Sequence, residues 1–160
     1  MQRAILIAAS LTAALALSAC ADDGGSGATV VLQGQASQAA LDAINGASIS
    51  TDATKGPAVT VPTEGQAYQP SDAPPPFRWT SPLTGAVYRL TFTIPGEGTV
   101  IVATTDTSYT PDATIWGQMK GASGRIMLEI VGASMNAAAI SDGPYKQATP
   151  RSFGIAATFW

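Results

Sequence analysis

Three segments of this 160-residue chain place an apolar side chain at every second position. Residues 77–79 read Phe-Arg-Trp, residues 87–94 read Val-Tyr-Arg-Leu-Thr-Phe-Thr-Ile, and residues 125–131 read Arg-Ile-Met-Leu-Glu-Ile-Val. This alternation is typical of β-strands with one buried face, because successive side chains of a strand point to opposite sides of the sheet. The centre of the chain is therefore predicted to form a sheet that covers an apolar core.

The first residues of the chain have the pattern of an export signal. A basic start at Arg3 is followed by an Ala- and Leu-rich apolar run over residues 4–17 and then by small residues. This order is that of a secretory signal peptide, and the run is shorter than the about 20 apolar residues that a membrane-spanning helix requires. Residues 1–19 are therefore predicted to be a signal peptide.

Residues 17–20, Leu-Ser-Ala-Cys, resemble the lipobox of bacterial lipoproteins. The resemblance implies that Cys20 becomes the mature N-terminus, with diacylglycerol on its sulfur and an acyl chain such as palmitate on its amine. Cys20 is the only cysteine, so it has no partner for an internal disulfide, and several buried acyl chains anchor a protein firmly. Ala21, in place of Asp, favours the outer membrane by the same resemblance. The alternative is an ordinary signal peptide in which Cys20 has no role.

Residues 20–56 are expected to form a flexible tether. Residues 22–27 read Asp-Asp-Gly-Gly-Ser-Gly, a composition typical of a solvated linker. Residues 29–32 are compatible with a short strand, and residues 37–44 with a helix that Ser37 would cap. Both segments offer few apolar residues for burial, so disorder is the favoured interpretation.

Residues 57–160 are predicted to form an all-β domain. A hairpin is expected from residues 87–94 and 99–104, joined by a turn at Pro95-Gly96. Thr110-Pro111-Asp112 is a helix-start signal, and residues 151–159 are expected to form the last strand. About seven short strands with one short helical turn predict an antiparallel sandwich of two sheets.

Residues 70–159 are similar to the fibronectin type III or immunoglobulin-like modules of bacterial envelope proteins. The segments that carry the resemblance are residues 77–79, 85–90, 107–111 and 126–130. Residues 112–120, Asp-Ala-Thr-Ile-Trp-Gly-Gln-Met-Lys, are similar to domains in lipoproteins of myxobacteria. The resemblance implies a spacer, scaffold or binding surface, and it leaves open that the chain is the N-terminal part of a longer protein. One departure is that residues 125–131 lack the tyrosine that type III modules usually carry near this strand.

The composition removes most catalytic and metal-binding chemistry. The chain has no histidine, the commonest general base and metal ligand, and its single cysteine is assigned to lipid. Its acidic residues lie mainly in turns or at a helix start, where solubility and capping explain them. A net charge of −3 disfavours nucleic acid. We therefore expect no catalytic residue, no metal site, no cofactor and no nucleic-acid partner.

Aromatic residues are the remaining candidates for a binding site. Trp79 and Trp116 could stack on a sugar ring, although their apolar neighbours in the sequence favour burial in the core. Tyr109 and Tyr145 lie near predicted loops, which favours exposed rings. Tyr109, Trp116 and Tyr145 are therefore the candidate ligand-binding residues.

The sequence predicts a non-enzymatic, lipid-anchored protein of the bacterial cell envelope. Its β-sandwich would act as a protein-interaction or spacer module, with an envelope protein or a polysaccharide as partner. The alternative is a carbohydrate-binding module for surface polysaccharide or peptidoglycan, which would require at least two exposed rings.

Overall fold

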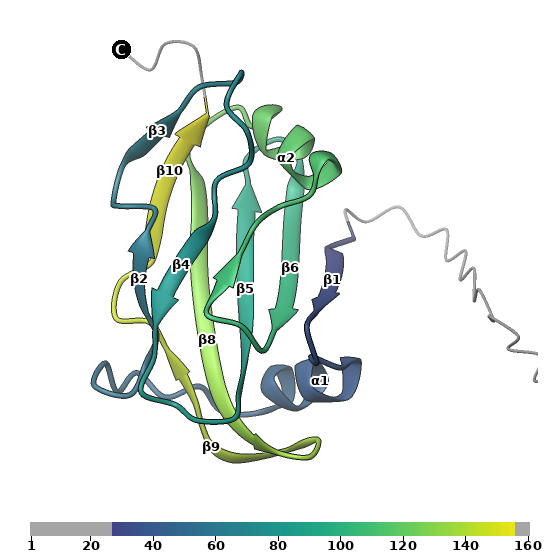
Figure 1. Ribbon diagram of the computed structural model, residues 1–160, viewed down its shortest axis with the longest axis vertical. Helices are drawn as coiled ribbons and strands as arrows, with labels where there is room; N and C mark the ends of the chain where they lie inside the picture. The colour runs from purple at the N-terminus through teal and green to yellow at the C-terminus, as the bar shows by residue number, and fades with distance from the viewer. Residues whose placement is uncertain (1–26, 156–160) are drawn as a thin grey trace, which may run out of the picture.

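A computed structural model describes residues 27–155 of the chain. The signal peptide, Cys20 and residues 156–160 of the predicted last strand lie outside this range. The elements in chain order are β1 (Thr29–Gln33), α1 (Gln38–Gly46), β2 (Ala58–Val61), β3 (Gln66–Tyr68), β4 (Phe77–Thr80), β5 (Ala86–Ile94), β6 (Gly98–Thr104), β7 (Ser108–Tyr109), α2 (Ala113–Lys120), β8 (Ile126–Asn136), β9 (Ala139–Lys146) and β10 (Arg151–Ile155). Figure 1 shows the chain as mostly β, with a large sheet behind a smaller one.

The large sheet has seven strands and is built around the predicted hairpin. β5 pairs antiparallel with β6 over seven residue pairs, and the turn between them has Gly96 at a φ of 87°. β8 pairs with the other side of β5 and is long enough to hold both β10 and β9 on its far side. The hairpin prediction is therefore confirmed, and residues 126–131 form a strand as their alternation indicated.

The prediction of a purely antiparallel structure is wrong. The main path of the large sheet is β1-β6-β5-β8-β10-β3, and both of its edge strands run parallel to their neighbours. The sequence pattern could not show this, because alternation predicts a buried face but not the direction of a neighbouring strand. The second sheet, β2-β4-β7, has three strands and is antiparallel.

The core lies between the two sheets and is aromatic. Phe77 of β4 packs against Phe92 of β5 and Phe153 of β10, with both pairs of ring centroids 5.1 Å apart. All three side chains have no exposed surface. The alternating residues of β4 and β5 therefore point into the core, as their spacing predicted.

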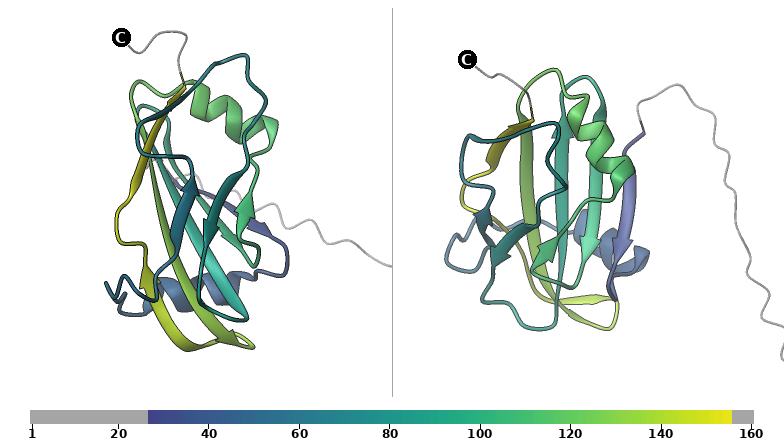
Figure 2. Two further views of the ribbon diagram at one scale, coloured as in Figure 1. Left: turned by 60° about the vertical axis from the view of Figure 1, so that its left-hand side comes forward. Right: turned by 45° about the horizontal axis from the view of Figure 1, so that its top comes forward.

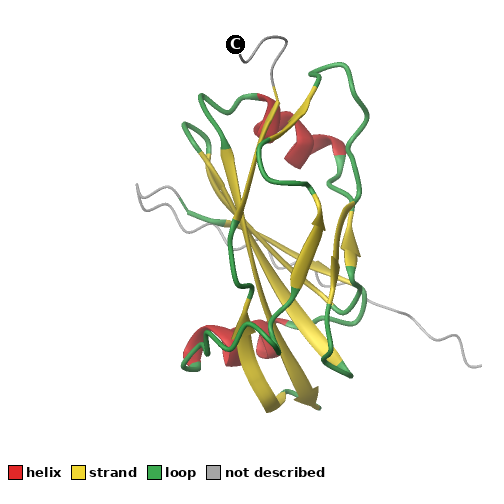
Figure 3. Cartoon of the chain, turned by 90° about the vertical axis from the view of Figure 1, so that its left-hand side faces the viewer, coloured by secondary structure: helices red, strands yellow, loops and turns green. Residues whose placement is uncertain are grey.

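α2 closes the upper end of the space between the sheets (Figure 3). Its N-cap is Asp112, whose Oδ1 accepts a hydrogen bond from the backbone N–H of Ile115 at 2.8 Å. Ile115, Trp116 and Met119 are buried in the core. The helix is therefore confirmed, but it has eight residues rather than one turn, and it is not the only helix of the described chain.

The expected tether is wrong for residues 29–46, which contain β1 and α1. Ser37 caps α1 by accepting a hydrogen bond from the N–H of Ala40, and Leu41 and Ile44 are buried. α1 lies on the outer face of the large sheet, away from the second sheet (Figure 2). The few apolar residues of α1 are enough to hold it in place because the sheet offers an apolar surface for them to pack against. The sequence of the segment alone does not show that surface. The described folded unit therefore starts near residue 29, not at residue 57.

Candidate functional site

The aromatic residues predicted to bind a ligand are buried. Trp116 is 2% exposed and Tyr109 is 4% exposed, and burial raises the pKa of Tyr109 to about 12. Trp116 donates a hydrogen bond from Nε1 to the backbone oxygen of Asp72 at 3.1 Å, so its polar atom is satisfied inside the protein. The expectation of exposed rings at Tyr109 and Tyr145 is wrong.

No ring platform exists on the surface of the described residues. All nine aromatic side chains within residues 27–155 are buried: Tyr68, Phe77, Trp79, Tyr88, Phe92, Tyr109, Trp116, Tyr145 and Phe153. All of them except Tyr145 pack on another aromatic ring, as Trp79 does on Tyr88 with their ring centroids 5.4 Å apart. Sugar stacking would need rings that face solvent. Cys20, the predicted lipidation residue, lies outside the described part of the chain.

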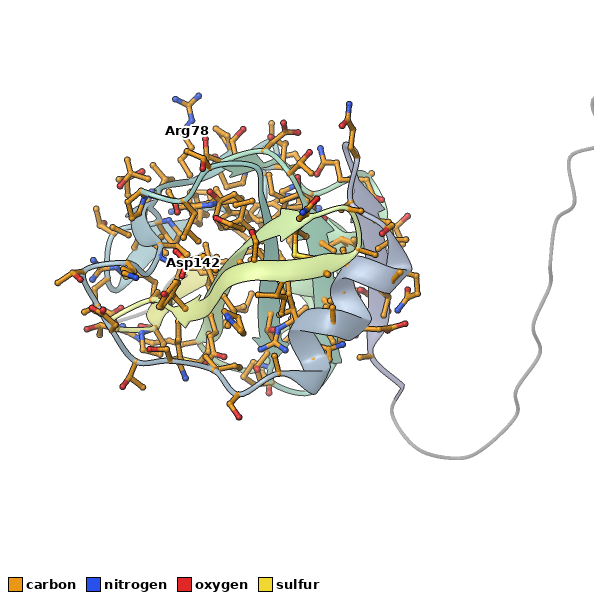
Figure 4. The ribbon with its side chains drawn as sticks, turned by 90° about the horizontal axis from the view of Figure 1, so that it is seen from below. Arg78 and Asp142 are labelled. Carbon is orange, nitrogen blue, oxygen red and sulfur yellow. The ribbon has the colours of Figure 1, made fainter. Side chains whose placement is uncertain are left out.

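Tyr145 belongs to a polar cluster that holds the segment before β2 against β9. Its hydroxyl donates to Asp142 at 2.5 Å and accepts from Lys55 Nζ at 3.1 Å. The hydrogen bond from Lys55 to Tyr145 and the nearby Asp142 carboxylate raise the pKa of Lys55. Figure 4, which views the molecule from below, shows Asp142 on the strands nearest the viewer and Arg78 at the upper rim of the picture. A lysine held in its charged form is a poor base, so we interpret the cluster as a structural contact.

A second polar cluster joins Glu64 to β10. Ser152 donates to the Glu64 carboxylate from both its backbone N–H, at 2.8 Å, and its hydroxyl, at 2.5 Å. These bonds lower the pKa of Glu64. A carboxylate with a lowered pKa accepts protons poorly, so this pair is unsuited to general base catalysis. Within the described residues, no three acidic side chains gather to hold a metal ion.

The outer face of the large sheet is covered over only part of its area. α1 packs over Val87, Val131 and Ala133 at the lower end, with Ala40 and Ile44 as its contact residues. Above α1, Figure 3 shows no helix formed by residues 27–155 on this face. We name this uncovered region the open face; its residues are Val30, Leu32, Thr91, Thr93, Thr99, Ile101 and Met127.

Strand register places these residues on one surface. Val30 of β1 lies opposite Ile101 of β6, which lies opposite Thr91 of β5. In the next row, Thr93 of β5 lies between Thr99 and Met127. Residues opposite one another on neighbouring strands share a face of the sheet. The open face is therefore a surface of methyl groups and threonine hydroxyls across four strands, with the carboxylate of Glu129 beside Thr91 at its border on β8.

The open face carries most of the large apolar side chains that the described chain exposes. Val30 is 46% exposed, Leu32 is 45% exposed and Met127 is 41% exposed. Ile49 is the fourth such residue of the described chain and lies in the segment after α1. Scattered apolar residues on a surface are ordinary, whereas several on one face indicate a contact surface.

On β5 and β8, a charged network lies between the open face and the part of the sheet that α1 covers. The carboxylate of Glu129 lies 2.5 Å from Lys146 Nζ and 4.0 Å from Arg89 Nη2. Arg89 also donates from Nη1 to the side-chain oxygen of Asn45, at the end of α1, at 2.7 Å. The network orients α1 and gives the open face a polar lower border.

A shallow groove of about 210 Å³ lies beside β1, on the inner side of the strand. It is lined by Val31, Leu32 and Gln33 of β1 and by Tyr109, Thr110 and Asp112. Its volume is below the range of about 300–1,000 Å³ that is usual for small-molecule sites. The open face itself is the surface of a sheet, which suits contact with another macromolecule better than enclosure of a small ligand.

The sequence did not single out the residues of the open face. Val30 and Leu32 lie in a segment interpreted as tether, and Met127 is the outward residue between two buried ones. The signal that could have found them is the occurrence of apolar residues at outward positions of strands, where polar residues are expected.

The described chain contains no helix with the length and apolar character that crossing a membrane requires. Comparisons with protein-family models, curated proteins and solved structures find no match.

Proposed function

We propose that this protein is a non-enzymatic lipoprotein of the bacterial cell envelope whose open face binds another protein. The observation that carries the proposal is that Val30, Leu32 and Met127, each more than 40% exposed, share one side of one sheet. Apolar surface that remains in water is unfavourable by roughly 25 cal/mol per Å² relative to burial. A partner that covers these side chains would recover that free energy.

A protein partner fits this surface better than a polysaccharide. Sugar-binding sites use exposed aromatic rings, and the described residues bury all of theirs. Apolar side chains with hydroxyl groups between them, bordered by charges, have the composition of a protein–protein contact with an apolar centre and a polar rim. The carbohydrate-binding alternative therefore has no supporting observation.

The side chains that the protein offers disfavour catalysis. The chain lacks histidine, and hydrogen bonds from Ser152 lower the pKa of Glu64 instead of raising it towards neutrality. General acids and bases work best with a pKa near the operating pH. The polar clusters of the described residues fit structural roles.

The anchor in this proposal is Cys20, with the outer membrane as the location. Support comes from the resemblance of residues 17–20 to a lipobox and from the position of Cys20 directly after an apolar signal core. The chain from Cys20 to Thr29 can span at most about 30 Å, because an extended residue adds about 3.3–3.6 Å. The partner would therefore lie close to the membrane.

The fold is proposed to be a modified immunoglobulin or fibronectin type III sandwich. Support comes from the two β layers around a shared aromatic core. β1 and α1 would be additions to that plan, and α2 would replace a turn. An experimental structure in which the two sheets do not face each other would contradict this assignment.

Site-specific photocrosslinking in intact cells tests the binding surface. A photoreactive amino acid at Thr93, exposed on the open face, is expected to capture a defined protein. The same group at Thr80, exposed on the second sheet, is expected to capture none. Adding Met127→Lys should abolish the capture at Thr93, because it places a charge directly opposite Thr93 on the neighbouring strand.

Two outcomes would contradict the proposal. Equal capture from Thr93 and Thr80, or capture from Thr93 that survives Met127→Lys, would show that the open face is not the binding surface. The anchor is tested separately with Cys20→Ser, which should release the chain from membranes. A Cys20→Ser chain that stays bound would disprove lipidation as the means of attachment.

A further inference from the structure

β1 is an edge strand without the features that normally protect one. Among the described residues, its outer side pairs with no strand. Its sequence, Thr-Val-Val-Leu-Gln, contains no charged residue, no proline and no glycine. Natural edge strands usually carry charges, proline or bulges, or are very short, because an unpaired edge offers hydrogen bonds to other chains. The opposite edge, β3, is protected in this way, since it has only three residues.

The side chains of β1 divide between the two faces of the sheet. Val30 and Leu32 are exposed on the open face, opposite Ile101 and Ala103 of β6. Val31 points to the other side, where it is partly buried against the core and lines the groove beside β1. Both faces of this edge therefore offer apolar surface to a neighbouring strand.

The sequence of β1 is complementary to itself in one antiparallel register. If Val31 lies opposite Val31 of a second copy, then Val30 lies opposite Leu32 and Thr29 lies opposite Gln33. Apolar residues then meet apolar residues, polar residues meet polar ones, and no like charges oppose each other. A shift by one residue would place exposed side chains against the core side and lose this match.

We propose that β1 pairs antiparallel with β1 of a second copy of this chain, in the register centred on Val31. The pairing joins two seven-stranded sheets into one and makes the two open faces a single surface. The second Val31 lies beside the groove, whose volume of about 210 Å³ leaves room for it. Five residue pairs bury less than the about 1,000 Å² expected of a stable interface, so association in solution is weak.

Attachment to one membrane favours this partner, a step that rests on the proposed lipid anchor. Anchored copies share a thin layer, which raises their effective concentration. In the antiparallel register the two Thr29 residues lie roughly 14 Å apart along the strands, at about 3.4 Å per residue. The chain between Cys20 and Thr29 spans up to about 30 Å, so both anchors can reach the same membrane.

Disulfide trapping of the full chain in its own membranes tests the register. Residues directly opposite in an antiparallel pair have Cα atoms about 4.5–5.5 Å apart, within the range that a disulfide bridges. Val31→Cys is therefore expected to give a covalent dimer on mild oxidation, in at least tenfold higher yield than Thr93→Cys. Thr29→Cys and Gln33→Cys, expressed together, should crosslink to each other, while Thr29→Cys alone should not.

A charge at the edge provides the second arm of this test. Adding Leu32→Lys to the Val31→Cys chain should lower the dimer yield at least tenfold, whereas adding Thr80→Lys should leave it unchanged. The proposal is overturned if Val31→Cys and Thr93→Cys crosslink equally, if Leu32→Lys has no effect, or if Thr29→Cys alone crosslinks as well as the mixed pair, which would indicate parallel strands.

The experiments test the dimer and the proposed function independently, so that either proposal can be disproved while the other stands. Photocrosslinking at Thr93 reports a partner of different mass whether or not β1 pairs. Conversely, a Cys20→Ser, Val31→Cys chain at high concentration should still form the disulfide dimer if the edge pairs but the anchor assignment is wrong.

Discussion

The two halves of the outer face of the large sheet belong to the same strands but differ in their surroundings. At the lower end, Val87, Val131 and Ala133 are covered by α1. At the upper end, Thr91, Thr93 and Met127 on two of those strands are only partly buried or exposed. We infer that the covered half contributes to the stability of the protein itself, and we propose that the open half contributes to binding.

Truncation of the contact beneath α1 should give the largest loss of stability. Ile44 has no exposed surface, and replacing a buried isoleucine by alanine typically costs about 2–5 kcal/mol. Ile44→Ala should therefore lower the free energy of unfolding by about that amount, measured by urea denaturation. Val30→Ala on the open half should cost less than about 0.5 kcal/mol. Similar costs for the two variants would remove the distinction between the halves.

Removal of the α1 cap should have a smaller effect. Ser37 accepts the hydrogen bond from Ala40 N–H at 3.2 Å, and loss of such a cap costs about 0.5–2 kcal/mol. Ser37→Ala should lower the midpoint of thermal unfolding, whereas Ser48→Ala, at an exposed position after the helix, should not. An unchanged midpoint for Ser37→Ala would show that α1 adds little to the covered half.

The ion pair between Glu129 and Lys146, which lies between the two halves, should contribute less to stability than the α1 cap. The Glu129–Lys146 pair is about one third exposed, with side-chain exposures of 30% and 34%, and pairs near the surface are worth about 0–1 kcal/mol. Lys146→Met should therefore destabilise by less than about 1 kcal/mol, and the difference should shrink at high salt. A loss that is large and independent of salt would indicate that Lys146 acts through packing.

The smallest change in stability is expected at Glu64, which accepts hydrogen bonds from Ser152 of β10, and only at acidic pH. The folded state lowers the pKa of Glu64 below its ordinary value of 4.5. Its contribution is therefore present above the unfolded pKa and is lost as the pH falls through the folded pKa. Glu64→Gln should lose less free energy of unfolding than the unchanged protein as the pH falls below about 4.5. Above that pH, the two proteins should show the same dependence of stability on pH, as measured by urea denaturation. An identical acid profile would show that other carboxylates dominate.

The sequence predicted the elements that local signals specify. The alternation of residues 87–94, the turn at Pro95-Gly96 and the helix-start signal of residues 110–112 each act within a few residues, and each has its counterpart in the structure, although the residue that caps α2 is Asp112. β1 and α1 were not predicted as part of the folded domain, because they are stabilised by segments that lie far away in the sequence. β1 needs β6, which is about 70 residues away in the sequence, and α1 needs the small apolar residues of β5 and β8.

The candidate site was less predictable than the fold. Tyr109 and Tyr145 lie near loops in the sequence, yet the core and the Asp142 contact bury both rings. Met127 lies between two core residues, and only its exposure in the folded chain distinguishes it from them. A surface made of ordinary apolar residues has no sequence motif, so strand register was needed to identify the residues of the open face.

Accessibility of the open face in the cell tests the central claim most directly. Thr93→Cys and Thr80→Cys chains would be labelled with a thiol reagent, purified and in intact cell envelopes, with modification followed by mass spectrometry of the peptide around each residue. Both positions should react rapidly in the purified protein, and Thr93→Cys should react at least tenfold more slowly in the envelope while Thr80→Cys is unchanged. Equal labelling of the two positions in the envelope would contradict the account.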